Sequence, residues 1–449
     1  MTESADKQRR DTGLRYSLVS ALGSKIVTAA VQITALPIAA RALGGPEFSL
    51  YSMLVASIGW LGLANFGVGS VLITRTAEAC ARGDLALQKR LLSNTLVPIT
   101  LFCGLTAAAI WAASDLLPVT EWLGIGQAVP RGEANSALIL LVLFVLFQCV
   151  LSVPEAFQAG YQEHYKVNLA GAVGNVGCLG LLLLASRNSP TVIDMVIAIN
   201  GPLLLARAGN AILFLARRRH LWPALRVIER RLMGELFGVG AIFSLAAGLG
   251  NFLCHQYPII LVGRAAGMIE AGKVAATLQA LVVCSGLIQT VTSSVLPGMS
   301  DSIARGDFHW GRDSYGRMLR FGLGFALLIW AAFGLFGERI FSLWYGGVVH
   351  IPAAVALGLG TYFFLLTWET LHYSILLAAG RISRSSLLYL GRAALAAVLI
   401  TFWGHRGAAA VYPCLIGSVL LVTLLAYYYE VRAVLQFSSV REETPDAQA

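Results

Sequence analysis

Charged side chains are scarce in this sequence, where Asp, Glu, Lys and Arg together make up only 13% of 449 residues. Soluble globular domains carry roughly 25% charged residues, because most of their surface faces water. Hydrophobic residues instead reach 57%, and the mean hydropathy is +0.71. The composition therefore excludes an ordinary soluble domain and indicates a membrane protein.

Paired cysteines and metal-ligating clusters are also lacking. All of the seven Cys except Cys80 lie in apolar stretches, and neither a C-x-x-C motif nor a His-rich spacing occurs. Disulfide frameworks and zinc sites both need such pairs of ligands. We therefore expect no disulfide, no metal site and no cofactor.

Long apolar stretches are what the sequence has in abundance. A helix needs about 20 mostly apolar residues to cross the hydrocarbon core of a bilayer. Twelve windows qualify: 17–40, 50–74, 93–114, 135–157, 167–185, 192–216, 236–262, 273–297, 319–337, 352–379, 386–403 and 408–429. They are continuous, unlike the alternating segments of about ten residues that build a membrane barrel. The predicted fold is an all-α polytopic membrane protein with about 12 transmembrane helices.

The positions of the 33 Lys and Arg residues predict the orientation. Three lie inside spans (Lys25, Arg207 and Arg392), and seven lie on the side opposite the N-terminus (Arg41, Arg131, Arg187, Arg264, Lys273, Arg339 and Arg406). The other 23 lie on the side of the N-terminus. Since basic loops stay in the cytoplasm, both termini are expected there. The excess positive charge then indicates contact with anionic lipid headgroups and does not argue for nucleic acid.

An internal repeat divides the predicted helices into two halves. Residues 41–47 (RALGGPE) and 81–84 (ARGD) recur as residues 264–270 (RAAGMIE) and 304–307 (ARGD), both at an offset of 223. Six helices per half make a parallel repeat, a layout typical of transporters. The predicted organisation is an N-terminal lobe (1–216), a basic cytoplasmic linker (217–232), a C-terminal lobe (233–435) and a polar tail (436–449).

The first helical hairpin carries a recognisable pattern. Residues 36–44 (LPIAARALG) close the first span with an Arg and Leu-Gly, and residues 63–75 (LANFGVGSVLITR) combine Gly-x-Gly-Ser with a closing Arg. This pattern resembles Wzx-type polysaccharide flippases of the MATE/MurJ-like MOP superfamily. The chain departs from the family at Asn65, where many relatives carry an acidic residue, and at Phe48-Ser49, which replaces the usual Tyr-Gly.

The resemblance implies a function and a location. Such proteins use alternating access to carry undecaprenyl-pyrophosphate-linked oligosaccharide across the bacterial inner membrane for surface polysaccharide assembly. The expected partners are this lipid-linked substrate, membrane lipids, and the polysaccharide polymerase and chain-length machinery. Neither an enzymatic activity nor a nucleic-acid partner is expected.

A pyrophosphate substrate needs cationic partners, and ionisable side chains inside a span are candidates because their burial in lipid is costly. Lys25, Arg207 and Arg392 meet this condition. Each side chain either lines a cavity or extends toward the headgroups. Lys25 is the preferred candidate, because it shares a polar helix face with Thr28 and Gln32.

Other polar residues inside spans form local patterns. Asn251 and His255 lie one turn apart before Pro258 and either bind the substrate or pack against a neighbouring helix. Glu369 and His372, also one turn apart, form either a proton-coupling pair or a neutralised structural pair. Glu155, near the inner end of its span, is expected to reach the interface.

Arg41 and Arg264 end matching outer helices. A helix that ends in Arg followed by Gly is an ordinary C-terminal signal, and Glu47 and Glu270 suit the start of the next helix. The alternative is that the two arginines form a periplasmic gate.

Three other protein classes compete with the flippase interpretation. A cation-coupled drug or metabolite exporter of the MATE type shares the helix layout, but its usual acidic residue in the first or seventh span is missing. The loop signature of major-facilitator transporters is also missing. A membrane polysaccharide polymerase or glycosyltransferase needs a large outer loop, whereas the longest one here, 115–134, carries no cluster of catalytic groups.

Overall fold

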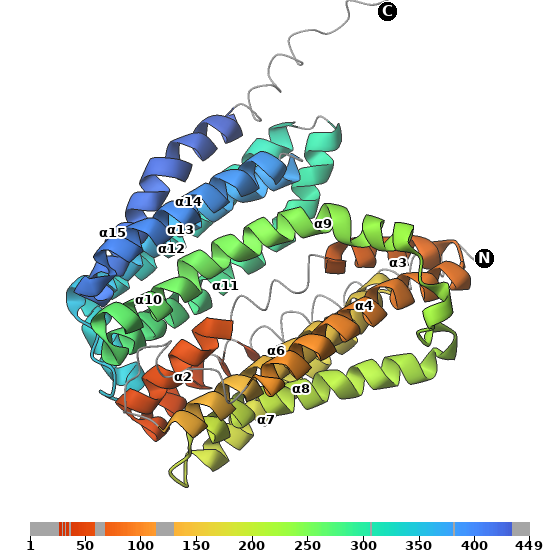
Figure 1. The fold of residues 1–449 in the computed structure, drawn as a ribbon. Coiled ribbons are helices and arrows are strands. Elements are labelled where there is room, and N and C mark those ends of the chain that lie inside the picture. The colour runs from red at the N-terminus through yellow and green to blue at the C-terminus, as the bar shows by residue number, and fades with distance from the viewer. Residues whose placement is uncertain are drawn as a thin grey trace, which may run out of the picture. The chain divides into compact units, whose positions relative to one another are not determined.

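In the computed structural model of this chain, residues 27–432 are described apart from 29, 32, 36, 59–67, 114–129, 306–307 and 380–381. Every regular element among these residues is a helix (Figure 1). The chain forms two compact units, Met1–Gly248 and Leu249–Ala449. The predicted all-α fold class is confirmed.

The first unit contains a helix across residues 27–43, described with gaps, and six further helices that lie wholly within it. These are α2 (Gly45–Ile58), α3 (Val68–Ala81), α4 (Leu85–Ala112), α6 (Arg131–Gly160), α7 (His164–Ala185) and α8 (Val192–Arg217). Two short 3-10 turns, η3 (Arg219–Leu221) and η4 (Leu225–Val227), then lead to α9 (Arg230–Asn251), which runs on into the second unit.

The second unit continues α9 through a π-helical segment, and another such segment interrupts its last span. Its elements are η5 (Phe252–Gln256), α10 (Tyr257–Ala266), α11 (Met268–Arg305), α12 (Phe308–Tyr345), α13 (Ala353–Ala378), α14 (Ile382–Trp403), η6 (Gly404–Arg406), α15 (Ala408–Ser418) and η7 (Val419–Thr423). Residues 424–432 form a further helical segment after η7. Together these helices form the second half of the predicted layout.

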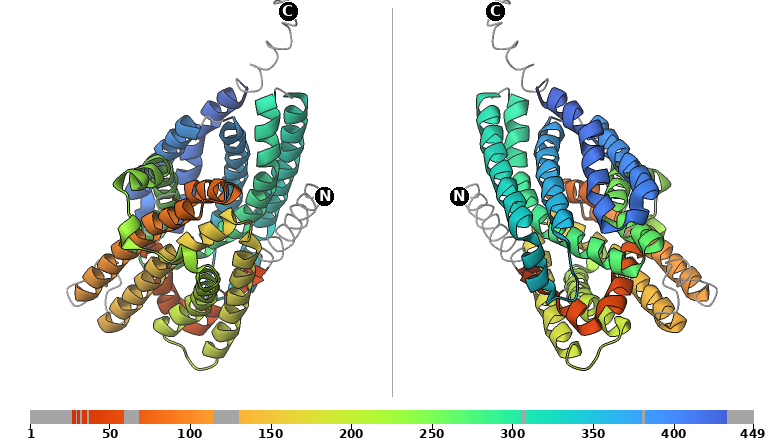
Figure 2. Two further views of the ribbon diagram at one scale, coloured as in Figure 1. Left: turned by 90° about the vertical axis from the view of Figure 1, so that its right-hand side faces the viewer. Right: turned by 90° about the vertical axis from the view of Figure 1, so that its left-hand side faces the viewer.

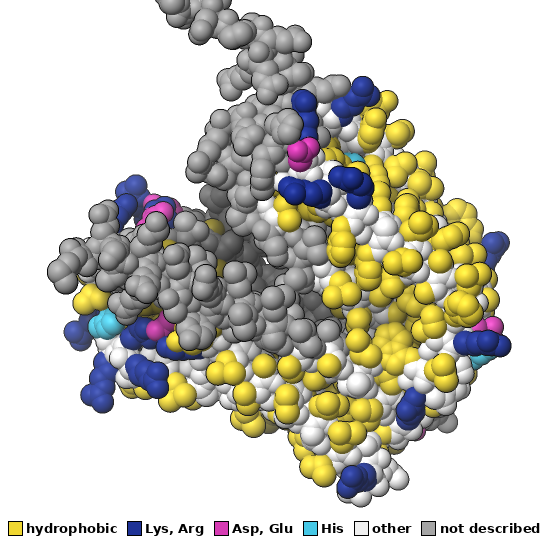
Figure 3. All heavy atoms as spheres, turned by 180° about the vertical axis from the view of Figure 1, so that it is seen from behind, with side chains coloured by type: hydrophobic (Ala, Val, Ile, Leu, Met, Phe, Trp, Pro, Cys, Tyr) yellow, Lys and Arg dark blue, Asp and Glu magenta, His cyan; other side chains and the backbone are white. Residues whose placement is uncertain are grey.

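Nine helices among the described residues are long and apolar enough to cross a membrane. They match the third to sixth and the eighth to twelfth predicted spans. The first two predicted spans run over undescribed residues, and the seventh is divided among α9, η5 and α10. Large apolar side chains such as Leu205, Leu335 and Leu421 are about three-quarters exposed (74%, 76% and 76%), as lipid-facing residues are. Figure 3 shows broad hydrophobic surfaces with Lys and Arg gathered near their margins.

The basic segment 217–232 packs against the first unit. The Asn94 side chain on α4 donates a hydrogen bond to the Val227 carbonyl oxygen (2.9 Å) and accepts one from the Glu229 backbone N–H (2.7 Å). Arg90 forms an ion pair with Glu229 (3.2 Å), and the Ser93 hydroxyl accepts from the Ala224 N–H (3.2 Å). These bonds give this segment a fixed path along α4. The predicted domain boundaries, however, stay a prediction.

Each of the duplicated turns contains a glycine with a positive φ angle. Gly44 and Gly267, which are 223 residues apart, have positive φ angles of 82° and 95° and follow the ends of their helices. Glu47 and Glu270 lie in the first turns of α2 and α11. A positive φ favours Gly over any other residue, so this position needs glycine in both copies. The ordinary interpretation of these motifs, helix end followed by helix start, is therefore confirmed.

The helices α12 and α13 form an antiparallel hairpin in the second unit, joined by residues 346–352 (Figure 2). A Cβ atom added at Gly337 would lie only 2.3 Å from the Ala356 Cβ. Small residues let membrane helices approach closely and so gain dispersion contacts. This close contact fixes the position of α13, which carries several of the candidate site residues.

Candidate functional site

In each unit, the described residues include an ion pair that joins two membrane-spanning helices. In the first unit, Arg207 on α8 makes two hydrogen bonds to Glu155 on α6, from Nε to Oε1 (2.6 Å) and from Nη2 to Oε2 (2.5 Å). The side chains are 22% and 11% exposed. The expected location of Glu155 near the interface stays a prediction, while its carboxylate lies against a guanidinium from a neighbouring helix.

A second polar pair extends the same helix contact. Gln158 and Asn210 lie three residues after Glu155 and Arg207 and exchange amide hydrogen bonds of 3.3 and 2.7 Å. Polar side chains that bond to each other across two membrane helices remove unsatisfied groups from lipid. In this arrangement Arg207 stabilises the contact of α6 with α8, and its predicted role in substrate binding stays a prediction.

The ion pair of the second unit is fully buried. Arg392 on α14 is 0% exposed, and its Nε lies 3.2 Å from Oε1 of Glu369 on α13, whose side chain is 4% exposed. The Nη1 group donates to the Tyr362 hydroxyl (3.2 Å), and the guanidinium carbon lies 4.9 Å from the centre of the Tyr389 ring. This contact with an aromatic face adds cation–π stabilisation.

Hydrogen bonding around this second pair is incomplete. Among the described residues, four polar atoms of this pair lack a hydrogen bond of normal geometry. They are both carboxylate oxygens of Glu369 and the Nε and Nη2 atoms of Arg392. The Thr423 hydroxyl lies beside the carboxylate, but its own bond goes to the Val419 carbonyl oxygen (3.3 Å). Burying two charges is costly, and the loss is recovered only with excellent geometry and further hydrogen bonds. The pair is therefore close in space but poorly satisfied.

Two π-helical segments flank α14 near this pair. The first, η5, precedes Pro258, and the Tyr257 N–H bonds to the Phe252 carbonyl five residues back. Because proline has no N–H, the normal helical ladder is broken and the register shifts. The second, η7, contains Thr423, and both segments contact α14. The prediction that Pro258 kinks or ends the helix is thus refined, since the helix continues through a π-bulge, a feature frequent at functional sites.

Asn251 and His255 border this first π-segment. His255 Nδ1 lies 3.2 Å from the Asn251 backbone carbonyl, and its ring is half-buried while Asn251 is exposed. The two residues are one turn apart, as predicted. Their role in substrate binding stays a prediction.

The predicted pairing of Glu369 with His372 is wrong. His372 Nδ1 lies 2.8 Å from the Trp368 carbonyl oxygen, and Nε2 lies 2.9 Å from the Tyr315 hydroxyl on α12. Its ring also stacks on Trp368, with centres 3.7 Å apart. Although they share a helix, Glu369 contacts α14 and His372 contacts α12, so the two side chains do not touch each other. Their predicted joint role in coupling stays a prediction.

Lys25 lies outside the described residues, but Thr28 of its predicted polar face is described. The Asn175 side chain on α7 donates a hydrogen bond to the Thr28 hydroxyl (2.8 Å). At this position the polar face therefore contacts a neighbouring helix of the first unit. The predicted role of Lys25 in substrate binding stays a prediction.

Among the described residues of the second copy, Arg264 is not the residue that Glu270 binds. Glu270 instead binds Lys273 Nζ (2.5 Å) and accepts a hydrogen bond from the Ala408 N–H (2.8 Å), which joins the starts of α11 and α15. Arg264 and Arg41 are both exposed. Their predicted gating role stays a prediction.

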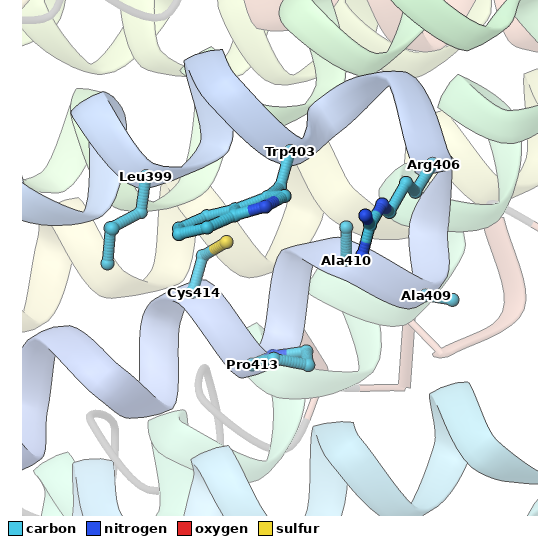
Figure 4. Close-up of a pocket in the computed structure, with 7 residues that line it drawn as sticks. All are labelled: Leu399, Trp403, Arg406, Ala409, Ala410, Pro413 and Cys414. Carbon is cyan, nitrogen blue, oxygen red and sulfur yellow. The ribbon is translucent and has the colours of Figure 1, made fainter.

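A cavity of about 490 Å³ lies near this turn, between α14 and α15 (Figure 4). Its lining residues are Leu399, Trp403, Arg406, Ala409, Ala410, Pro413 and Cys414. The Trp403 ring lies over Cys414, and Arg406 is the only charged lining residue among those described. The cavity is thus mostly apolar, with one cation at its end.

A third carboxylate, Glu163, lies between α6 and α7 and holds the start of the basic segment. It binds Arg218 (2.8 Å) and Lys166 (3.0 Å), and the Arg218 guanidinium lies 4.6 Å from the ring centres of both Tyr161 and Phe214. Burial by itself would raise the pKa of Glu163, but its hydrogen bonds to the two cations outweigh burial and hold this pKa below the usual 4.5. The Glu163 carboxylate is therefore ionised at neutral pH.

The chain matches the model of a known protein family. The family model described as "Polysaccharide biosynthesis protein" matches residues 16–303. The chain belongs to this family. The resemblance found in the first hairpin is confirmed, and the protein is a multi-pass membrane protein of a transporter family. No curated protein sequence matches it significantly.

Solved structures share the fold of this family member. One is an inward-facing multidrug resistance MATE family transporter of the MOP superfamily (TM-score 0.71, 14% identity, 93% of this chain and 99% of that chain). Another is an outward-facing MATE family transporter (0.61, 14%, 94% and 96%). A third is a MOP superfamily transporter from Pyrococcus furiosus (0.64, 13%, 94% and 96%). Identities this low establish the MATE fold of two six-helix lobes and no more.

Several contacts of the two ion pairs were not predicted from the sequence. Glu155 could have been linked to Arg207, because acidic residues inside spans are rare and need a partner. Tyr362 and Tyr389 give no such signal, since tyrosine is common in apolar helices and only the packing brings these two to Arg392. Among the described residues, no group of three His, Cys, Asp or Glu is placed to bind a metal.

Proposed function

We propose that this protein translocates undecaprenyl-pyrophosphate-linked oligosaccharide across the bacterial inner membrane by alternating access. The family match over residues 16–303 carries this proposal. The basic residues on the side of the N-terminus support a cytoplasmic location for both termini. Lipid-linked glycan, membrane lipids and the polymerase and chain-length machinery are the proposed partners.

The fold itself does not select a substrate, because one fold can host several functions. The Pyrococcus furiosus transporter of the same fold has a binding pocket whose reverse polarity suggests a different function for that protein. The substrate of the present chain therefore has to be inferred from its family and its own residues. Lys25 remains the preferred cation for the pyrophosphate, because it lies within a span on a polar helix face.

The test is the location of lipid-linked glycan in a strain that lacks the protein. We expect undecaprenyl-pyrophosphate glycan to build up at the cytoplasmic face of the inner membrane and the wild-type chain to remove it. The Lys25→Ala variant should fail to do so at equal membrane abundance. Lys89→Ala is the matched control, because Lys89 lies near the start of α4 outside the predicted spans and should retain activity.

One observation favours a second function, cation-coupled export of small molecules. Glu369 is a nearly fully buried carboxylate inside a span, and such groups often carry protons or ions in transporters. A deletion strain that translocates glycan normally, without a redundant transporter, and gains sensitivity to cationic drugs would support the exporter. That result would overturn the flippase proposal.

A further inference from the structure

A second cavity of the Leu249–Ala449 unit combines two arginines with aromatic rings. It measures about 420 Å³ and lies at the ends of three helical segments. Its lining residues are Arg312, Tyr315 and Leu319 from α12, Trp368 and His372 from α13, and Tyr428, Val431 and Arg432 from the last segment. No acidic side chain occurs among the described residues that line it. We call it the Arg312/Arg432 pocket.

The pocket lies where apolar spans reach the membrane surface. Arg312 is the second residue of the apolar span Gly311–Tyr345, and Arg432 is the last residue of the span Ala408–Arg432. Both arginines are exposed. Tyr315 and Tyr428 lie about one turn further into these spans, at the depth of an interfacial aromatic belt. The helix connections bring the start of α12 and the ends of α13 and the last segment to the same membrane face.

His372 fixes the inner wall of the pocket. A carbonyl oxygen can only accept, so the contact with Trp368 assigns a proton to Nδ1 of neutral His372. Nε2 is then the acceptor, and the Tyr315 hydroxyl donates to it. The same imidazole stacks on Trp368. His372 is thus a positioning residue that holds two aromatic side chains, and its side chain is only 4% exposed.

We propose that the Arg312/Arg432 pocket binds the phosphate of an anionic membrane lipid headgroup. Two guanidinium groups offer forked donors that match phosphate oxygens. Leu319, Val431 and the aromatic rings provide an apolar wall for the adjoining part of the lipid. Basic pockets between membrane helices at the cytoplasmic side suit anionic lipid headgroups, and the distribution of basic residues predicts that this end faces the cytoplasm.

Two lipids share this chemistry. An anionic phospholipid of the surrounding bilayer presents a phosphodiester, and a polyprenyl-linked substrate presents a pyrophosphate. The pocket itself does not depend on the proposed glycan substrate, because the phosphate of any anionic lipid satisfies the two arginines. The experiment therefore has to include both lipids and a water-soluble anion.

The test is equilibrium binding to the purified full-length chain, delipidated in detergent micelles and measured by native mass spectrometry. The probes are phosphatidylglycerol, phosphatidylcholine, undecaprenyl pyrophosphate and inorganic pyrophosphate. We expect the wild-type chain to retain at least one of the two anionic lipids on the order of tenfold more tightly than phosphatidylcholine. The double variant Arg312→Gln/Arg432→Gln should lose that preference.

Arg320→Gln is the matched control, because Arg320 is an exposed arginine of α12 that does not line the pocket. It should retain the wild-type preference. A second double variant, Arg312→Lys/Arg432→Lys, keeps both charges but loses the forked geometry, and we expect an intermediate affinity. All variants alter exposed side chains, and size-exclusion chromatography checks their folding.

Each outcome decides the proposal. Tighter binding of phosphatidylglycerol identifies a bilayer lipid as the ligand, whereas tighter binding of undecaprenyl pyrophosphate identifies the substrate lipid. The proposal is overturned if Arg312→Gln/Arg432→Gln binds every probe as the wild type does. It is also overturned if phosphatidylcholine binds as tightly as the anionic lipids, or if inorganic pyrophosphate alone binds.

Discussion

The ion pairs of the two units use the same residue types in opposite environments. Arg207 and Glu155 form two short hydrogen bonds at 22% and 11% exposure, next to a second pair of amide side chains. Arg392 and Glu369 lie at 0% and 4% exposure, and among the described residues four of their polar atoms have no normal hydrogen bond beyond this 3.2 Å contact. The more deeply buried pair is thus the less satisfied one.

This difference predicts a structural role for the first pair and a functional role for the second. A bidentate pair recovers much of the energy lost on removing its charges from water, so the first pair stabilises a helix contact. A poorly satisfied buried pair contributes little to stability, and a change of partner or protonation at Glu369 during transport stays a prediction. The two π-helical segments against α14 support this view, since such bulges are frequent at functional sites.

The largest expected effect is that of Glu369→Gln. This change leaves the buried Arg392 guanidinium without a counter-ion, and removal of one partner from a buried pair costs about 3–5 kcal/mol. We expect a large drop in the thermal midpoint of the purified protein in detergent. Thr370→Val, which removes a hydroxyl that bonds to the Leu366 carbonyl oxygen of the same helix, is the control. A midpoint equal to that of the wild type would show that the Glu369 carboxyl is not charged in the folded protein.

Replacement of both charges sharpens the comparison. In the double variant Glu369→Leu/Arg392→Met, no buried charge remains, and such replacements are often neutral or stabilising by about 1–4 kcal/mol relative to the original pair. We expect the thermal midpoint to return at least to the wild-type value while glycan translocation is lost. Normal translocation by this double variant would show that the pair has no function in transport.

Glu155→Gln should have a smaller effect than Glu369→Gln. Arg207 is partly exposed, and its long side chain can extend toward the headgroups when its partner is removed. We expect a loss of about 1.5–3 kcal/mol, the range of hydrogen bonds to charged groups. The comparison of thermal midpoints for the two single variants checks this order. A larger drop for Glu155→Gln would reverse our assignment of roles.

Much of the fold could be predicted from the sequence because it depends on local properties. Apolar stretches of about 20 residues identify spans one by one, and nine of the predicted spans appear as continuous helices. The repeated motifs predicted matching turns, and Gly44 and Gly267 adopt them. Pro258 marked an interruption, but proline alone does not specify whether a helix kinks, ends or forms a π-bulge.

The candidate site could be predicted only in part, because its contacts are not local. The sequence identified Arg207, Arg392 and Glu369 as unusual, since each is ionisable and lies within a span. It paired Glu369 with His372 because they share a helix face, whereas rotation of each side chain toward a different neighbour separates them. Such side-chain pairings depend on how α12, α13 and α14 pack together, and sequence periodicity alone does not specify that packing.

The smallest expected effect concerns Glu163, a carboxylate outside the spans. Its pKa is lowered by Arg218 and Lys166, so it binds fewer protons in the folded state than in the unfolded state as the pH falls. Its stabilisation is complete above about pH 5, decreases as the pH falls through the lowered pKa, and amounts to at most about 1 kcal/mol, because the side chain is partly exposed. Thermal midpoints of wild type and Glu163→Gln should therefore differ at pH 7 and converge below pH 4. A constant difference across this range would mean that the ionised carboxylate contributes nothing, and that the variant is destabilised by altered packing against Arg218.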